Sequence, residues 1–399
     1  MTNTQVPAQE QWAREPLPST LPGWLDRARQ VRDIYSLNDA SRDRERTPAH
    51  PQVQLLKQAG LHRLLGPVEH GGAGAEWPWV HRIIREVASG DGSLGQLLGY
   101  HYLWYAWPRL TGSPSQAAGF EADATAGNWF LAGALDSDDT RVTIREDGDH
   151  LIFNGVKHCA TGVRYSDVTM VGGLLNGTHV VGFVPTDQPG LLLHDDWDSM
   201  GQRLTASDTL TLQDLHVRAD RTVTSLGNAY STMTVPVRQL IFASIWLGIA
   251  SQALRETAEY SHKHGRGWGG YEKLVDEPRV IDVVGDLTAK LWTAEALLDK
   301  VAEEGVPLHR DPSSVTARTR GEYKVRTAAV QARAQEVAVE VGSRLFEVTG
   351  ARSTTSAFGF DRFWRNARTH TLHDPVSYQH EEIARYAILG AVPTPGWYS

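Results

Sequence analysis

Apolar positions recur every three or four residues in the first part of the chain, between about residues 40 and 110. HPQVQLLKQAGLHRLL and WPWVHRIIREVASG both show this spacing, which is typical of amphipathic helices. VEHGGAGAEW separates them and predicts a loop, because it contains three glycines. Residues 1–30 hold four prolines and little periodicity, so we expect a flexible arm there and a helical domain over residues 31–127.

The pattern changes to short strands after about residue 128. TRVTIREDGDHLIFNGVKHCATG alternates apolar and polar residues and carries two turn signals, DGD at 147–149 and NG at 154–155. DVTMVGGLL, THVVGFVPT, PGLLLHDD and DTLTLQDLHV continue the short-strand pattern to about residue 221. The pattern therefore predicts a compact antiparallel β domain over residues 128–232.

Helical spacing returns in the last part of the chain. VRQLIFASIWLGIASQALRETAEYSHKHG predicts a long apolar helix that ends at Gly265. A second helix is expected over about residues 278–304, a third after Pro312, and a shorter fourth in HDPVSYQHEEIARYAILG. Residues 233–399 are thus predicted to form a four-helix bundle with a tail. The fold class is α+β: an N-terminal helical domain, a central antiparallel β domain and a C-terminal four-helix bundle.

Composition narrows the functional classes. A net charge of -8 argues against a nucleic-acid binder, which normally carries a basic face. The single cysteine, Cys159, allows no internal disulfide and suits a reducing cytosol. We see no apolar run of about 18 residues and no signal-peptide core, and so expect a cytoplasmic protein without a membrane partner.

Standard catalytic motifs are absent from the sequence. It contains no G-x-G-x-x-G after a strand, no Walker loop, no H-E-x-x-H, no C-x-x-C and no G-x-S-x-G. HKHG at 262–265 has no acidic or sulfur residue nearby, so no metal site is predicted. Tryptophans cluster in GYHYLWYAWP, GRGWGGY and DRFWRN, which are equally compatible with core packing and with a pocket for a flat aromatic ligand.

Hydroxyl side chains gather at two predicted strand ends. CATGVRYSD and GQRLTASDT place Thr161, Thr205 and Ser207 there, either as turn caps or as the rim of a polar cofactor site. The GARSTTS segment at 350–356 combines Arg352 with four hydroxyls. It suits a phosphate group, and equally a solvated helix end.

The segment THTLHDP near the C-terminus offers two histidines, His370 and His373. Asp374 is a favoured N-cap and Pro375 a favoured first helical residue, so a helix is predicted to begin there. His373 would then lie outside the positive end of the helix dipole, which favours a neutral imidazole able to act as a base or hydrogen-bond partner. Alternatively, only Asp-Pro matters and His373 is incidental.

Five blocks together resemble a known family. They are GLHRLLGPVEHGGAGAEW, DGSLGQLLGYH, FNGVKHCATG, DDWDSMGQRLTASDT and GFDRFWRNARTHTLHDPVSY. In this domain order they resemble the two-component (group D) flavin monooxygenases built on the acyl-CoA dehydrogenase fold, especially dibenzothiophene monooxygenase and the xiamycin-type indole hydroxylases. The resemblance runs from about Leu55 to the C-terminus.

The resemblance implies an oxygenase that uses reduced flavin (FADH2 or FMNH2) and O2. A separate NAD(P)H:flavin reductase would supply the flavin, and a flavin C4a-hydroperoxide would hydroxylate an aromatic heterocycle, such as an indole in natural-product biosynthesis. Alternatives are S-oxygenation of a dibenzothiophene-like heterocycle, an acyl-CoA dehydrogenase or oxidase, and a non-catalytic relative. The family also implies a homo-oligomer, with a tetramer (dimer of dimers) expected.

The resemblance assigns roles to matching residues. The implied catalytic residues are His373, Thr161, Tyr100 and His370. The implied cofactor-binding residues are Thr161, Thr205, Ser207, Arg266, Arg352, Trp197 and His373, with the two arginines holding the flavin phosphate across a subunit interface. The implied substrate pocket consists of Gln96, Tyr100, Ala134, Trp197, Phe242 and Trp246.

Three departures refine these expectations. Gln96 stands where dibenzothiophene monooxygenase has histidine, and Ala134 where it has asparagine. Both positions face the substrate, so a different flat heterocycle is favoured. LHDP also stands where many acyl-CoA dehydrogenases carry their glutamate base, which favours a monooxygenase.

Overall fold

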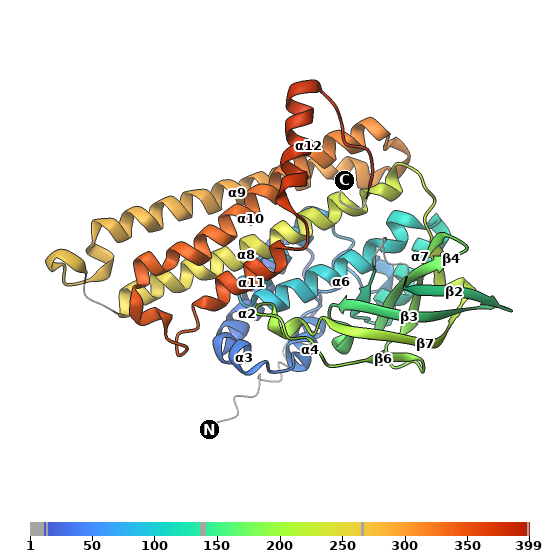
Figure 1. The fold of residues 1–399 in the computed structure, drawn as a ribbon, viewed down its shortest axis with the longest axis horizontal. Coiled ribbons are helices and arrows are strands. Elements are labelled where there is room, and N and C mark those ends of the chain that lie inside the picture. Colours follow the sequence, from blue (N-terminus) through green and yellow to red (C-terminus); the bar gives the residue numbers. More distant parts are fainter. Residues whose placement is uncertain (1–11, 13–14, 136–140, 265–266, 397–398) are drawn as a thin grey trace.

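The computed structural model describes residues 12, 15–135, 141–264, 267–396 and 399. N-terminal helices, a β-sheet and long C-terminal helices follow one another in the expected order (Figure 1). The sheet covers one end of the molecule, and the long helices extend away from it toward the other end (Figure 1). The predicted fold class is therefore confirmed.

The N-terminal helical part begins earlier than predicted. Its helices are α2 (Leu21–Ser36), α3 (Asp39–Glu45), α4 (His50–Gln58), α5 (Trp77–Ala88), α6 (Gly92–Thr111) and α7 (Pro114–Ala126). Thr20 caps α2, and Pro22 lies in its first turn, where a proline costs no hydrogen bond. Trp24 on α2 is fully buried. Residues 21–30 therefore belong to the helical part, and the predicted arm over residues 1–30 was too long.

The central helix α6 is buried along nearly its whole length. Its N-cap Asp91 accepts hydrogen bonds from the backbone N–H groups of Ser93 at 3.0 Å and Leu94 at 3.3 Å. Asp91 also forms a buried ion pair with Arg42 on α3, at 3.0 Å. These contacts fix the residue at which α6 begins. They therefore also fix the position of each of its side chains along the helix axis.

The sheet is mixed rather than wholly antiparallel as predicted. Its strands are β1 (Leu131–Ala134), β2 (Val142–Asp147), β3 (His150–Ala160), β4 (Val168–Leu175), β5 (Thr178–Pro185), β6 (Leu191–Leu193), β7 (Asp208–Arg218) and β8 (Thr222–Thr224). The order is β6-β7-β3-β2-β4-β5-β8, with β1 beside β4. Two pairings, β1–β4 and β2–β4, are parallel. The sheet encloses a second apolar core that includes Phe153 and Val217.

Only one of the two predicted turns exists. Asp147 and His150 pair across the first turn, where Gly148 has a φ of 64°. The NG prediction was wrong, because Asn154 and Gly155 continue β3 through a register shift against β7. A Cβ on Gly155 would lie 2.0 Å from the carbonyl oxygen of Arg141. This glycine therefore permits a close approach of two strands and does not form a turn.

The C-terminal bundle consists of α8 (Thr234–Lys263), α9 (Pro278–Arg310), α10 (Ala317–Thr349) and α11 (Asp361–Thr371). The first three run side by side along the molecule, and the shorter α11 packs against α8 and α10 (Figure 1). His264 is the C-cap of α8, whereas the predicted stop Gly265 lies outside the described residues. The second helix extends past the predicted 304 to Arg310.

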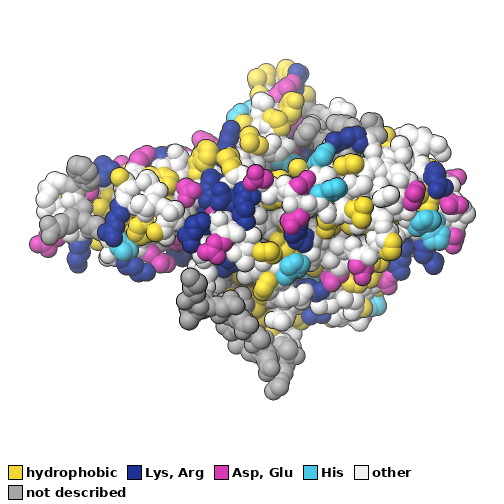
Figure 2. Space-filling model, turned by 60° about the horizontal axis from the view of Figure 1, so that its bottom comes forward, with side chains coloured by type: hydrophobic (Ala, Val, Ile, Leu, Met, Phe, Trp, Pro, Cys, Tyr) yellow, Lys and Arg dark blue, Asp and Glu magenta, His cyan; other side chains and the backbone are white. Residues whose placement is uncertain are grey.

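The predicted fourth helix is not part of the bundle. It forms α12 (Val376–Leu389), which projects from the body (Figure 1) and buries only Gln379 and Glu382. Ile388 and Leu389 near its end are 79% and 68% exposed. Hydrophobic side chains are also visible on this projection in the space-filling view (Figure 2). The fourth bundle helix is instead α11, whose mostly polar sequence gave no clear apolar stripe.

One expectation about hydropathy was also wrong. Among the described residues, Tyr230–Lys263 is long and apolar enough to cross a membrane by length and composition, and an 18-residue window within it has a mean hydropathy of 1.4. However, 94% of that window is buried within the fold. Its apolar character is therefore explained by its position as α8, the most buried helix of the bundle.

Candidate functional site

A cavity of about 410 Å³ lies where α6 and α8 meet strands β1 and β3. Its aromatic lining residues are Tyr100, Trp104, Trp107 and Phe242. Its other lining residues include Gly133, Ala134, Arg141, Lys157, His158, Cys159, Arg238 and His373. No aspartate or glutamate is among the described residues that line it. The volume and the flat apolar walls suit a small aromatic molecule.

The aromatic wall follows from helical geometry. Tyr100, Leu103, Trp104 and Trp107 are spaced i, i+3, i+4 and i+7 on α6, and so share one face. Phe242 on α8 stacks against Tyr100 with ring centroids 5.7 Å apart and planes 15° apart. The two helices thus contribute one stacked aromatic pair to the lining of the cavity.

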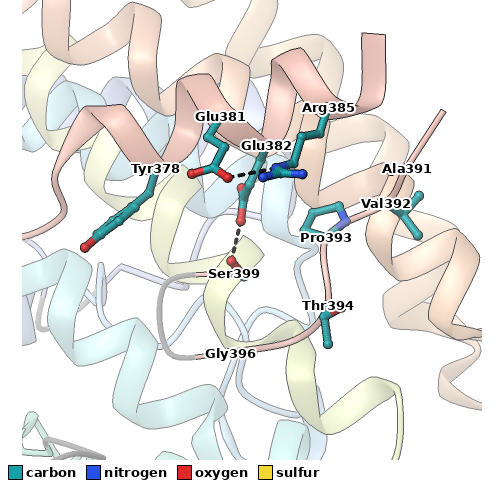
Figure 3. Close-up of a pocket in the computed structure, with 10 residues that line it drawn as sticks. All are labelled: Tyr378, Glu381, Glu382, Arg385, Ala391, Val392, Pro393, Thr394, Gly396 and Ser399. Carbon is teal, nitrogen blue, oxygen red and sulfur yellow. Dashed lines mark hydrogen bonds and ion pairs between the residues drawn. The ribbon is translucent and has the colours of Figure 1, made fainter. Parts of the chain in front are cut away.

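A second hollow of about 400 Å³ lies between α12 and the segment formed by residues 391–396 and 399 (Figure 3). Glu381, Glu382 and Arg385 give it a charged wall, and Ser399 Oγ donates a hydrogen bond to Glu382 (Figure 3). None of the residues predicted for the site lies in it. The cavity beside α6 is therefore the candidate site.

The three predicted hydroxyls form one buried chain. Thr161 Oγ1 is 2.9 Å from Ser207 Oγ, which is 2.8 Å from Thr205 Oγ1. Thr205 Oγ1 donates to the carbonyl oxygen of Gln202 at 2.8 Å. A carbonyl accepts only, so the Ser207 proton must go to Thr205 and the Thr161 proton to Ser207. Thr161 therefore offers only lone pairs to a bound molecule.

His370 has a fixed tautomer. Trp246 Nε1 donates a hydrogen bond to its Nδ1 at 2.7 Å, and its Nε2 lies 3.3 Å from Tyr100 Oη. Indole nitrogen is a donor only, so the ring proton of His370 sits on Nε2. Burial, together with the nearby His373 ring, lowers the pKa of His370 to about 3. His370 is therefore neutral near neutral pH.

His373 has a carboxylate as its partner. Its Nδ1 lies 3.1 Å from Asp374 Oδ1. Asp374 is fully buried and accepts hydrogen bonds from Arg238 at 3.4 Å and Gln331 at 3.1 Å. Burial favours the neutral acid, but Arg238, His373 and Gln331 hold the pKa of Asp374 well below its usual range. An ionised carboxylate accepts only, so His373 Nδ1 donates to it, and in the neutral form of the ring Nε2 is the acceptor.

This geometry corrects the predicted helix start. Pro375, not Asp374, is the N-cap, α12 begins at Val376, and no side chain caps it. The Asp374 carboxylate is held instead by Arg238 and Gln331, because a buried charge binds a guanidinium more strongly than a backbone N–H. The group beside the His373 ring is thus a carboxylate. The prediction that the helix dipole favours a neutral His373 therefore does not apply.

Three residues expected to line the substrate pocket, Gln96, Trp197 and Trp246, are not among the described lining residues. Trp246 is fully buried and contacts His370 from behind the wall. Gln96 lies one turn before Tyr100 on α6, and its buried Oε1 has no hydrogen-bond partner among the described residues. Tyr100, Ala134 and Phe242 do line the cavity, as does His373.

The residues predicted to hold the flavin lie in two places. Trp197 Nε1 donates to the Gln202 carbonyl at 2.9 Å, the same carbonyl that accepts from Thr205. Arg352 follows α10, and its guanidinium carbon lies 5.9 Å from the centroid of the Phe358 ring. It borders a separate hollow of about 580 Å³. Arg266 lies outside the described residues.

Sequence reasoning missed Arg238 and Gln331, which hold Asp374. Arg238 interrupts the apolar run of α8, and Gln331 lies inside α10. Charged residues are rarely buried without a partner, so Arg238 within an otherwise apolar helix was the available signal. It could not indicate which carboxylate it binds.

Comparison with known proteins adds the family. Residues 240–378 match the family described as acyl-CoA dehydrogenase, C-terminal domain. The crystal structure of TdsC from Paenibacillus sp. A11-2 with FMN and indole is similar, with a TM-score of 0.89 and 34% identity over 94% of this chain and 99% of that chain. Dibenzothiophene monooxygenase of Mycolicibacterium goodii is 34% identical over 94% of this chain and 96% of its own. The probable FMNH2-dependent monooxygenase SfnC of Pseudomonas putida is 29% identical over 93% and 96%.

Fold and site together define a flavoprotein with the acyl-CoA dehydrogenase fold. Within that class, the chain belongs to the family of dibenzothiophene monooxygenase, whose members are two-component flavin-dependent monooxygenases. The enzyme uses reduced flavin and O2, and the flavin comes from a separate reductase. The family and cofactor predicted from the sequence are therefore confirmed.

The described residues fit a reduced flavin. Reduction of the isoalloxazine ring adds N–H donors, and Thr161 offers only acceptor lone pairs. Thr161, Ser207, Thr205 and Trp197 would hold the ring system beside the aromatic wall. When bound, the flavin activates O2 and transfers one oxygen atom to the substrate.

Proposed function

We propose that this monooxygenase oxygenates a flat aromatic heterocycle, with an indole-type compound from natural-product biosynthesis as the preferred substrate. The observation that carries the proposal is the cavity lined by the aromatic side chains of Tyr100, Trp104, Trp107 and Phe242. TdsC, which is 34% identical, has been crystallised with FMN and indole.

A sulfur heterocycle is the second candidate. Dibenzothiophene monooxygenases at 34% identity support S-oxygenation of a dibenzothiophene-like compound equally well. The departures at Gln96 and Ala134 favour indole, because both change the polarity and size of the predicted substrate side. An acyl-CoA substrate is disfavoured, because no carboxylate is among the described lining residues to abstract a carbon-bound proton.

The protein's own residues have three tasks in this proposal. Tyr100, Trp104 and Phe242 orient the aromatic substrate and exclude water. Thr161 orients the flavin by accepting a ring N–H. His373, with Nδ1 held by Asp374, presents Nε2 as a proton acceptor at the cavity wall.

A homotetramer, as a dimer of dimers, is part of the proposal. Arg352 borders a hollow separate from the cavity that Tyr100 and His373 line, so the described residues of one chain do not bring the predicted phosphate-binding arginine to the proposed flavin ring site. A neighbouring subunit would supply it. We expect Arg352→Ala to weaken binding of reduced FMN by about tenfold or more, since a charge-assisted contact is lost. Light scattering would measure the assembly, and a monomer that binds flavin equally well would refute this part.

The test of function is direct. Protein, flavin, a generic NADH-dependent flavin reductase, NADH and ¹⁸O2 are mixed with indole or dibenzothiophene, and products are analysed by mass spectrometry. One ¹⁸O atom in an indole product, with a higher kcat/KM than for dibenzothiophene, is expected. Hydrogen peroxide alone with both compounds would refute the proposal. Bleaching of the bound flavin by an acyl-CoA without O2 would favour a dehydrogenase.

A further inference from the structure

Trp246 is buried in the apolar core, yet its indole N–H donates a hydrogen bond to a polar side chain. It lies on α8 with no exposed surface, and its Nε1 donates to His370 Nδ1 at 2.7 Å. The indole nitrogen has a proton and no available lone pair. His370 Nδ1 must therefore be free of a proton, and a neutral imidazole then carries its proton on Nε2.

The tautomer of His370 affects the cavity through the hydroxyl group of Tyr100. His370 Nε2 lies 3.3 Å from Tyr100 Oη, so Nε2–H donates and the phenol oxygen accepts. The phenol proton then turns away from His370. Burial raises the pKa of Tyr100, so its proton is retained near neutral pH. Tyr100 lines the cavity, so a hydroxyl proton that points away from His370 is available to a molecule bound there.

We propose that Trp246 is a positioning residue that holds His370 in its Nε2–H form and thereby turns the Tyr100 hydroxyl proton toward the molecules bound in the cavity. The inference rests on the proposed function, in which that cavity holds substrate beside the flavin. His370 takes up no proton near neutral pH, because burial lowers its pKa to about 3. The three side chains therefore form a fixed hydrogen-bond chain that orients a donor, not a path for proton transfer.

The first measurement requires no substrate. Protein labelled with ¹⁵N-histidine is examined by NMR, and the His370 signals are assigned by their loss in His370→Gln. The wild type is expected to show an unprotonated Nδ1 and a protonated Nε2. Trp246→Phe removes the donor and keeps an aromatic ring, so a mixture of tautomers is expected. An unchanged tautomer would overturn the proposal.

The matched control is Trp24→Phe. Trp24 is also fully buried, and its Nε1 has no hydrogen-bond partner among the described residues. The same change of volume there leaves the His370 signals unaltered. If Trp24→Phe shifts the tautomer as much as Trp246→Phe does, the effect is general loosening of the fold, and the proposal fails.

The second measurement is the coupling of NADH use to product. Trp246→Phe is expected to lower the product formed per NADH about tenfold, the equivalent of one hydrogen bond. A new pH dependence should also appear, because the uncapped Nδ1 can now accept a proton. In a Tyr100→Phe background, the same substitution should cause no further loss. Additive losses would mean that Trp246 does not act through Tyr100.

The two proposals can fail separately. If wild-type protein gives only hydrogen peroxide with every heterocycle tested, the proposed function fails, and the NMR spectra still decide the His370 tautomer. If product forms normally but Trp246→Phe changes neither tautomer nor pH profile, the positioning role fails alone.

Discussion

His370 and His373 are three residues apart and have opposite surroundings. His370 is 4% exposed and hydrogen-bonded on both nitrogens by Trp246 and Tyr100. The His373 side chain is 40% exposed, lines the cavity, and contacts the buried carboxylate of Asp374. One imidazole is enclosed among neutral partners, whereas the other is held by a charge.

These different surroundings indicate different roles for the two histidines. A histidine with both nitrogens satisfied and a pKa of about 3 cannot exchange protons near neutral pH. A histidine with a carboxylate on Nδ1 keeps Nε2 as an acceptor beside the cavity. We therefore expect substitutions at His370 to act through stability and through the orientation of the Tyr100 hydroxyl, and those around His373 to act directly on the fate of oxygen.

The largest effect is expected at Asp374. Asp374→Ala leaves Arg238 buried without this carboxylate and removes the partner of His373. The free energy of unfolding should fall by about 3 kcal/mol, and coupling to product should fall as well. Urea unfolding measures the first effect. The control Glu336→Ala breaks an exposed pair with Arg333 and should change stability by less than about 0.5 kcal/mol.

His373→Ala should give the next largest effect. Loss of the acceptor is expected to lower product formation about a hundredfold, while reduced flavin is still consumed and hydrogen peroxide released. The fold should be retained, because the side chain is partly exposed. Product and peroxide are measured together against NADH. If the variant couples NADH use to product as well as the wild type does, His373 has no catalytic role, and only Asp374 and Pro375 matter in this segment.

The smallest effect concerns pH and His370. An unfolded histidine binds a proton below about pH 6.5, but folded His370 does so only near pH 3. Stability should therefore be complete above about pH 6.5 and fall as the pH drops toward 3, because the unfolded state takes up the extra proton. His81, His101 and His309, whose pKa values burial lowers to about 3, 4 and 4, add to this trend.

His370→Gln tests this pH effect. Gln retains a donor and an acceptor for the neighbouring groups and does not titrate. The fall in unfolding free energy between pH 7 and pH 5 should be shallower in the variant, by at most about 1.4 kcal/mol per pH unit. Parallel pH curves for wild type and variant would contradict the assignment of a neutral, buried His370.

Much of the fold could be predicted, because the period of the apolar residues and the length of each periodic segment distinguish helices from strands. The 3.6-residue spacing and the change to alternation near residue 128 placed the helices and the sheet correctly. The NG turn failed because Gly155 serves a close approach between strands, which depends on Arg141, a distant residue in the chain. α11 was missed because its apolar stripe is narrow, and α12 was misplaced because periodicity does not say what a helix packs against.

Part of the site was predictable for the same reason. The hydroxyl residues Thr161, Thr205 and Ser207 were found as strand-end residues, and the fold joins them into one chain. The partners of the histidines were not predictable. Trp246 and Arg238 come from α8, more than a hundred residues earlier, and local spacing carries no information about such contacts.

The cap of α6 has a consequence for how this family can diversify. Asp91 and Arg42 anchor the helix outside the cavity, whereas positions 100, 103, 104 and 107 form its wall. Because the anchor and the wall share no residue, a wall side chain can be exchanged without shifting the helix that presents it. Selection for a new heterocycle, or directed evolution in the laboratory, can then proceed one residue at a time. Each step would alter the shape of the cavity and leave the anchor of α6 in place.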